Sequence, residues 1–223
     1  MTSSGNMSDR STLEQAWNRI HQEKPTSDRP EAEIVAFAEH LRYRWPSGAR
    51  VLDVGCGRGR NILYLSQVGL AVCGCDLSPV ALQVARQRMR KANATAIFQV
   101  ADSINLPFPD GLFEAAICVH VLLYQLKADI VQSIRELRRT LKPGGRLYLD
   151  LLDCDDAEYG CGPELEEHTF GDPDGTPVHF STRQEVNELL LGFDRDRVAR
   201  LEWGPRPRVG WVVWLVKSEG SLA

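Results

Sequence analysis

The sequence has no long apolar run and no apolar leader. None of its segments approaches the roughly 18 uninterrupted apolar residues of a membrane-spanning helix, so we expect no membrane partner. Residues 1–11 lack the hydrophobic region of a secretory signal, and we expect them to form a mobile tail. With no targeting segment, the expected location is cytoplasmic.

Metal-binding patterns are also missing. Six cysteines are present, but none belongs to a C-x-x-C pair. Three of the six lie in predicted buried strands, namely Cys73, Cys75 and Cys118. We expect these three to be reduced thiols that pack as small apolar groups. A metal site could be imagined from Cys154, Cys161, His168 and nearby acids, but their spacing matches no standard ligand pattern. We therefore predict no metal.

The sequence also lacks an excess or a cluster of positive charge. The formal net charge is −4, and no basic stripe is interleaved with aromatic residues. Proteins that bind nucleic acid usually carry such a stripe, because phosphates must be neutralised. The composition therefore predicts no nucleic-acid partner.

What the sequence does contain is an alternation of strands and helices. Its 223 residues suit one domain with a full core. We expect helices at 12–24 and from 28 to about 46, and then five strands alternating with helices up to residue 151. Such alternation predicts a parallel sheet covered on both faces. A helix at 182–191 and strands at 197–203 and 209–217 complete the expected domain, 12–217, followed by a short tail at 218–223.

A glycine turn follows the first strand of this sheet, in the segment VLDVGCGRGRN at 51–61. Glycines let backbone N–H groups approach a ligand closely at the carboxyl edge of a sheet, where open α/β folds bind cofactors. A pyrophosphate turn would read G-x-G-x-x-G, but its third glycine is replaced by Arg60. Asp53, two residues before the first glycine, would repel a diphosphate and would suit an ammonium group. The turn therefore favours a cationic ligand over a dinucleotide.

Two further acids follow strand ends in the same way. Asp76 ends the second strand 23 residues after Asp53, close to the roughly 20-residue offset expected of a carboxylate that binds a ribose diol. Asp102 follows the third strand. Ser78 and Pro79 are typical of the start of a helix directly after Asp76.

These residues resemble class I S-adenosylmethionine-dependent methyltransferases. The resemblance implies a Rossmann-like, doubly wound α/β fold, with a seven-stranded sheet that is mostly parallel and has one antiparallel strand. It implies S-adenosyl-L-methionine as cofactor, with Asp53 at the ammonium, Asp76 at the ribose and Asp102 at the adenine. Residues 12–45 would cover this site. The cofactor-binding residues implied are Trp17, Asp53, Gly55, Cys56, Gly57, Asn61, Asp76, Leu77, Ser78, Asp102, Ser103, Ile104 and Val119.

A narrower resemblance concerns residues 152–180, which are acidic and contain no Lys or Arg. Tellurite-resistance-related methyltransferases carry an insertion here, and the segment Gly57–Leu65 is similar to theirs. We expect an irregular stretch that acts as a lid over the substrate, because unstructured loops beyond roughly 12–15 residues are usually functional or disordered. A solvated surface loop is the open alternative.

The chemistry expected of such a site is alignment of a nucleophile with the sulfonium methyl group. A neutral acceptor would also need a proton acceptor, and the candidates are His120, Tyr124 and His179. His120 could instead support the cofactor loop through its backbone, and Trp17 could simply pack in the core. Arg206 and Arg208 could bind an anionic substrate, although a solvated turn is the simpler interpretation.

The Asn/Asp-Pro-Pro-aromatic motif of enzymes that methylate exocyclic or amide nitrogens is absent. The sequence therefore predicts a methyltransferase, monomeric or homodimeric, for a small-molecule acceptor, with thiols and chalcogen oxyanions suggested by the narrower resemblance. A non-catalytic S-adenosylmethionine-binding protein of the same fold is the alternative. A nicotinamide oxidoreductase is a third hypothesis, against which Arg60 and Asp53 argue.

Overall fold

We analysed a computed structural model of the chain, which describes residues 9–24, 27–203 and 208–218. The helices of this part, in chain order, are α1 (Arg10–Glu23), α2 (Ala32–Arg44), α3 (Arg60–Gln67), α4 (Pro79–Lys91), the 3-10 helix η1 (Leu122–Tyr124), α5 (Lys127–Thr140) and α6 (Arg183–Leu189). The strands are β1 (Arg50–Val54), β2 (Ala71–Asp76), β3 (Ile97–Val100), β4 (Phe113–Cys118), β5 (Leu141–Asp153), β6 (Glu164–Glu166), β7 (Thr169–Gly171), β8 (Pro177–Ser181), β9 (Phe193–Trp203) and β10 (Arg208–Lys217).

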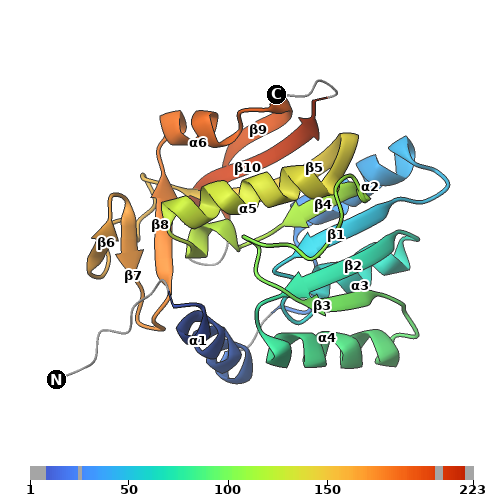
Figure 1. Ribbon diagram of the computed structural model, residues 1–223, viewed down its shortest axis with the longest axis horizontal. Helices are drawn as coiled ribbons and strands as arrows, with labels where there is room; N and C mark the ends of the chain where they lie inside the picture. Colours follow the sequence, from blue (N-terminus) through green and yellow to red (C-terminus); the bar gives the residue numbers. More distant parts are fainter. Residues whose placement is uncertain (1–8, 25–26, 204–207, 219–223) are drawn as a thin grey trace.

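The sheet confirms the predicted Rossmann-like class. Seven of its ten strands run in the order β3-β2-β1-β4-β5-β10-β9 (Figure 1). β1 to β5 pair in parallel, whereas β10 is antiparallel to both of its neighbours. The order reverses at β1 and β4, which is where open α/β sheets form a ligand crevice.

Two apolar layers fix the helices on the faces of this sheet. One layer joins the sheet to α5 and α6 through residues such as Ile134, Leu137 and Leu190. The other joins it to α2, α3 and α4, with Phe37, Ile62 and Leu82 fully or almost fully buried. Strands covered on both faces are near-continuously apolar, as the burial of β1 and β4 shows.

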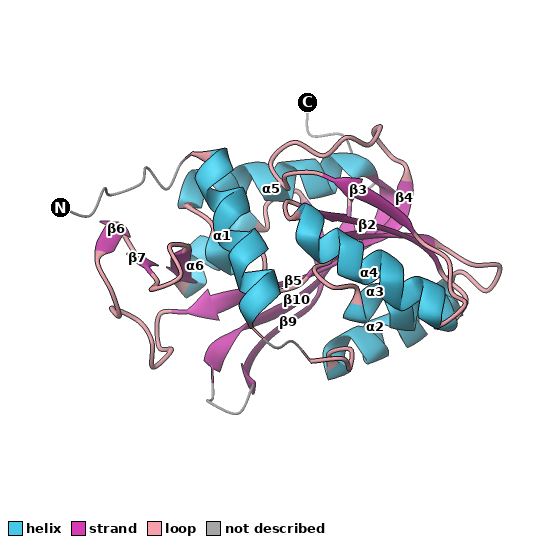
Figure 2. Ribbon diagram, turned by 90° about the horizontal axis from the view of Figure 1, so that it is seen from below, coloured by secondary structure: helices cyan, strands magenta, loops and turns pink. Residues whose placement is uncertain are grey.

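The first helix occupies a different position. α1 lies across the carboxyl edge of the strands, beside α4 (Figures 1 and 2). It begins at Arg10, two residues earlier than the predicted domain boundary, because Asp9 caps it by accepting a hydrogen bond from Ser11 N at 3.1 Å. Only Leu13 and Ala16 of this helix are buried, so α1 is a cover and not a core element.

Residues 152–179 are not the irregular stretch that the sequence predicted. They contain the β6–β7 hairpin and most of β8, which adds in parallel to the end of β5 through Leu152–Phe180 and Asp153–Ser181. A second difference is the segment Leu141–Gly145, whose sequence Leu-Lys-Pro-Gly-Gly is typical of a helix end but which the structure includes in β5. In both segments the sequence has residues typical of turns, but the backbone is extended.

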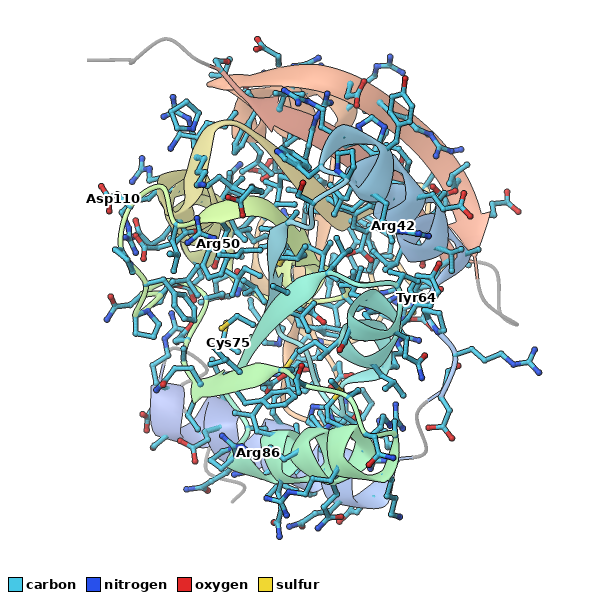
Figure 3. The ribbon with its side chains drawn as sticks, turned by 90° about the vertical axis from the view of Figure 1, so that its right-hand side faces the viewer. Arg42, Arg50, Tyr64, Cys75, Arg86 and Asp110 are labelled. Carbon is cyan, nitrogen blue, oxygen red and sulfur yellow. The ribbon has the colours of Figure 1, made fainter. Side chains whose placement is uncertain are left out.

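The cysteines of the central strands are buried, as expected. Cys75 lies within the sheet, whereas Asp110 is at the margin of the molecule (Figure 3). Burial raises the pKa of the Cys75 and Cys118 thiols, with the nearby carboxylates adding to the effect. Along the described ranges, no helix combines the length and apolar character needed to cross a bilayer.

One helix offers a test of this packing. Phe37 of α2 is 1 % exposed and contacts the rings of Tyr148 and Trp214, whereas Tyr43 of the same helix is 88 % exposed. We expect Phe37→Ala to lower the free energy of unfolding by about 3–5 kcal/mol, because it leaves a cavity. Tyr43→Ala, the control, should change it by less than about 0.5 kcal/mol. Urea denaturation measures both, and equal losses would contradict this account of the core.

Candidate cofactor and methyl-transfer site

A cavity of about 360 Å³ opens at the carboxyl edge of the sheet, under α1. Its size lies within the range of roughly 300–1,000 Å³ that is usual for small-molecule sites. The glycine turn contributes Gly55, Cys56 and Gly57, and α3 contributes Asn61. The other predicted residues that line it are Asp76, Leu77, Asp102, Ser103, Val119 and Trp17. The fold thus brings residues from five segments to one hollow.

Three of the predicted cofactor residues do not line this cavity. Asp53 lies beneath the turn at 1 % exposure, and its Oδ2 has no hydrogen-bond partner. Ser78 is buried as the cap of α4, where its hydroxyl accepts from Ala81 N at 3.1 Å. Ile104 N donates to Asp102 Oδ1 at 3.2 Å, so it supports the Asp102 loop from behind.

The turn has a backbone that only glycine adopts easily. Gly55, Gly57 and Gly59 have φ angles of 68°, 52° and 79°, all in the left-handed region. A Cβ on Gly55 would lie 2.1 Å from Val121 Cγ2, so a side chain there cannot be accommodated without a shift. The turn is also tied to β2, because Gly55 N and Cys56 N both donate to Cys75 O.

Asp76 joins the turn to the next helix. Its Oδ2 accepts from Gly57 N and its Oδ1 accepts from Ser78 N, both at 2.8 Å. A carboxylate has about four acceptor positions, so each oxygen keeps capacity for a ligand hydroxyl. Burial raises the pKa of Asp76, and the two N–H donors and His21 oppose that rise.

Two buried acceptor atoms beneath the glycine turn have no hydrogen-bond partner, and the first belongs to Asp53. Burial, followed by the charge of Asp76, raises the pKa of Asp53 well above its usual range, with only Arg60 opposing. Asn61 Oδ1 is another buried acceptor without a partner. Buried polar groups are normally satisfied, so these orphaned acceptors under the turn fit a ligand that brings a cationic donor.

Two polar side chains that the sequence did not predict, Arg10 and Gln125, lie at the adenine end of the predicted cofactor position. Arg10 of α1 bridges Asp102 and Asp129, at 3.1 Å and 2.8 Å. Gln125 Nε2 donates to Ser103 Oγ at 2.6 Å. No motif surrounds Arg10 or Gln125, and only the fold brings them together.

The three candidate proton acceptors have different surroundings. His120 lines the cavity with a φ of 55°, and its N–H donates to Asp150 Oδ1 at 2.7 Å. Tyr124 also lines it and meets the Trp17 ring edge-on, with 5.2 Å between ring centres. Burial raises the pKa of Tyr124, which disfavours its ionised form.

His179 is not at the cavity. Its ring is 1 % exposed and lies between Thr169 Oγ1, 2.7 Å from Nδ1, and Glu185 Oε1, 3.2 Å from Nε2. The geometry therefore gives no support to a role in proton transfer. Arg208 forms an ion pair with Glu158, and Arg206 lies outside the described residues.

The acidic insertion and α1 are connected to each other. Lys24 forms an ion pair with Asp174, and Arg19 Nη2 donates to Asp174 O at 2.6 Å. The insertion also reaches the cavity itself, at Pro177. Both segments thus contribute residues to the cavity wall, and the role of the insertion as a lid stays a prediction.

Comparisons with known proteins agree with this geometry. The family model described as "Methyltransferase domain" matches residues 52–149. A demethylmenaquinone methyltransferase of Deinococcus radiodurans is 35 % identical over 117 residues, covering 52 % of this chain and 46 % of that protein. The tRNA N(3)-cytidine methyltransferase METTL2 of Gallus gallus is 30 % identical over 163 residues, covering 68 % and 44 %. This chain thus spans under half the length of either relative.

Solved structures extend the likeness to most of the chain. A SAM-dependent methyltransferase from Methanosarcina mazei matches with a TM-score of 0.70 and 26 % identity, over 78 % of this chain and 94 % of that one. The chain thus has the fold of SAM-dependent methyltransferases, and its residues 52–149 match a methyltransferase domain. TehB from Haemophilus influenzae has a TM-score of 0.67 at 17 % identity, over 91 % of this chain and 67 % of that one, which supports the shared fold but not the narrower resemblance.

The glycine turn of the methyltransferase domain can be tested by a matched pair. Gly55 and Gly111 both have positive φ, 68° and 62°, but a Cβ on Gly111 would meet nothing within 4 Å. We expect Gly111→Ala to lower the free energy of unfolding by about 1–2 kcal/mol through backbone strain alone. Gly55→Ala should lower it by a further 1–3 kcal/mol or so, because of the clash with Val121. Chemical denaturation measures the pair, and equal losses would show that the turn tolerates a side chain.

Proposed function

We propose that this chain is an S-adenosyl-L-methionine-dependent methyltransferase that acts on a small-molecule acceptor. The observation that carries the proposal is the glycine turn, with its left-handed backbone, lying over the orphaned carboxylate of Asp53 and beside Asp76 at the floor of a covered cavity. The methyltransferase-domain match over residues 52–149 supports it.

Each end of the cofactor has a proposed partner. Asp53 would attract the ammonium group, and Asp76 would accept hydrogen bonds from the ribose hydroxyls. Asp102 and Ser103 lie where the adenine would be read, and Arg10 holds the Asp102 carboxylate in place. Val119 and Trp17 would pack against the apolar parts.

Chemistry follows from this placement. When bound, the sulfonium supplies an electrophilic methyl group, so the protein has only to align an acceptor and exclude water. Alignment of two reactants can lower a barrier by roughly 7–11 kcal/mol in favourable cases. The cover formed by α1 and Pro177 is suited to excluding water.

The acceptor is bounded by the size and surroundings of the cavity. Under the connected cover, a compact molecule fits better than a folded RNA, although one relative acts on tRNA. Within that class we keep thiols and chalcogen oxyanions as the finer proposal. Both are soft or anionic nucleophiles that suit a methyl group on sulfur.

Isothermal titration with S-adenosylmethionine and its demethylated product tests cofactor binding directly. Incubation with methyl-labelled cofactor and the small-molecule fraction of a cell extract then tests transfer. Label in a small product supports the proposal. Absence of binding would overturn it, and binding without transfer would identify the non-catalytic alternative.

Asp76 offers a mutational test of the ribose contact. We expect Asp76→Ala to weaken cofactor binding by about 1–3 kcal/mol, because ligand hydroxyls lose their acceptor and the turn loses the bond from Gly57 N. Asp194→Ala is the control, since Asp194 is exposed on β9 and does not line the cavity. Titration calorimetry measures both, and equal affinity in Asp76→Ala and the parent would show that the ribose lies elsewhere.

A further inference from the structure

Four charged side chains from four separate segments form a chain at the edge of the cavity. Asp150 of β5 contacts His120, His120 approaches Glu31, and Glu31 pairs with Arg60 at the start of α3. The distances are 3.1 Å from His120 Nδ1 to Asp150 Oδ2, 3.6 Å from Nε2 to Glu31 Oε1, and 2.8 Å from Arg60 Nη2 to Glu31 Oε1. His120 and Arg60 both line the cavity.

Asp150 fixes His120 at two places. One oxygen accepts from the His120 backbone N–H at 2.7 Å, which stabilises a left-handed backbone that a non-glycine residue rarely adopts. The other oxygen contacts Nδ1, so Nδ1 carries the proton in the neutral ring. A buried carboxylate that orients an imidazole through Nδ1 is the arrangement by which histidine bases are held in the correct tautomer.

The proton acceptor of the neutral ring is therefore Nε2, which lies 3.6 Å from Glu31 Oε1. The Asp150 side chain is 4 % exposed, whereas those of His120 and Glu31 are 31 % and 35 % exposed. The Nδ1 partner of His120 is thus enclosed, whereas its Nε2 partner is partly exposed.

We propose that Asp150 and Glu31 are positioning residues that make His120 the general base for a methyl acceptor that arrives with its proton, a neutral thiol or hydroxyl. This inference rests on the proposed methyltransferase function. The acceptor X–H gives its proton to Nε2, and the X–C bond forms as the S–C bond of the cofactor breaks. The electron pair of that bond goes to sulfur, which leaves as a neutral thioether.

Glu31 has its role after the proton has moved. The Glu31 carboxylate lies 3.6 Å from Nε2 and is held there by Arg60, so its charge is close to the proton that Nε2 has received. The resulting imidazolium lies between two carboxylates, so its charge is stabilised without solvent. An acceptor that is already an oxyanion would gain nothing from this arrangement, so of the two acceptor classes proposed above the base favours the thiol.

The electrostatics agree with the geometry. Burial by itself lowers the pKa of His120, but the charge of Asp150 and the contact with Glu31 outweigh it, and the net pKa is raised despite Arg60. A raised pKa makes the imidazole a stronger proton acceptor, as a general base requires. The base is active when unprotonated, so transfer rises as the pH rises through the His120 pKa, and removing either carboxylate charge must move this rise to lower pH.

Proton NMR of the histidine rings in the full-length protein tests the arrangement. Loss of one resonance in His120→Gln identifies His120 among the five histidines. We expect its titration midpoint to fall in Asp150→Asn and, by less, in Glu31→Gln. Glu33→Gln is the matched control, because Glu33 is on α2 and pairs with Arg197 instead. It should leave the midpoint unchanged.

Methyl transfer from labelled cofactor to the small-molecule extract supplies the second measurement. His120→Gln should lower the rate by a factor of about 10²–10⁴, and the pH profile of each variant should follow its NMR midpoint. An unchanged titration midpoint of His120 in both Asp150→Asn and Glu31→Gln would overturn the proposal. So would a pH profile of methyl transfer that stays in place when the midpoint moves. Titration with S-adenosylhomocysteine, the demethylated cofactor, distinguishes failure of the base assignment from failure of the proposed function. If the variants bind it as the parent does, only the base assignment has failed. If the parent does not bind it, the proposed function itself is wrong.

Discussion

The hydrogen bonds from Gly57 N and Ser78 N to Asp76 are the interaction on which the site depends. They join the end of β2, the glycine turn and the start of α4 through one carboxylate. They also keep a second negative charge close to Asp53, which is buried without a partner for Oδ2. Holding two carboxylates this near in an apolar crevice costs folding energy, and a cationic ligand would offset that cost. The unfavourable placement of Asp53 next to Asp76 is therefore explained by ligand binding.

The cover of the cavity, unlike the glycine turn, is held by several weak contacts. α1 buries only two residues, so its position relies on polar contacts at both of its ends: Arg10 with Asp102 and Asp129, and Lys24 with Asp174. Exposed pairs of this kind are each worth less than about 1 kcal/mol. A cover held by several weak contacts can open at modest cost, whereas the turn beneath it, tied to β2, stays fixed. This contrast suits a site that must admit and release a large cofactor.

The sequence predicted the elements whose signals are local. The glycine turn and the cap at Ser78 are each visible in one short segment, and the alternation of strands and helices predicted the parallel sheet. The strands inside the acidic insertion were missed, because β8 pairs with β7 and with the end of β5, and neither pairing is visible in the sequence. Arg10 was missed for the same kind of reason, since its partners Asp102 and Asp129 are about a hundred residues away. His179 looked available in the sequence but is enclosed by Thr169 and Glu185 once the hairpin folds.

The contrast between His120 and His179 shows why residue type alone could not identify a base. Both imidazoles have a carboxylate near Nε2, so this contact does not distinguish them. The difference lies at Nδ1, which meets the carboxylate of Asp150 in His120 but the hydroxyl of Thr169 in His179. A second carboxylate stabilises an imidazolium where a hydroxyl cannot do so to the same extent. Because Asp150 is at the end of β5 and His120 follows β4, the parallel pairing of these two strands brings the carboxylate to the imidazole beside the cavity. The chemistry proposed for the site is thus a consequence of strand order, just as the cofactor crevice is.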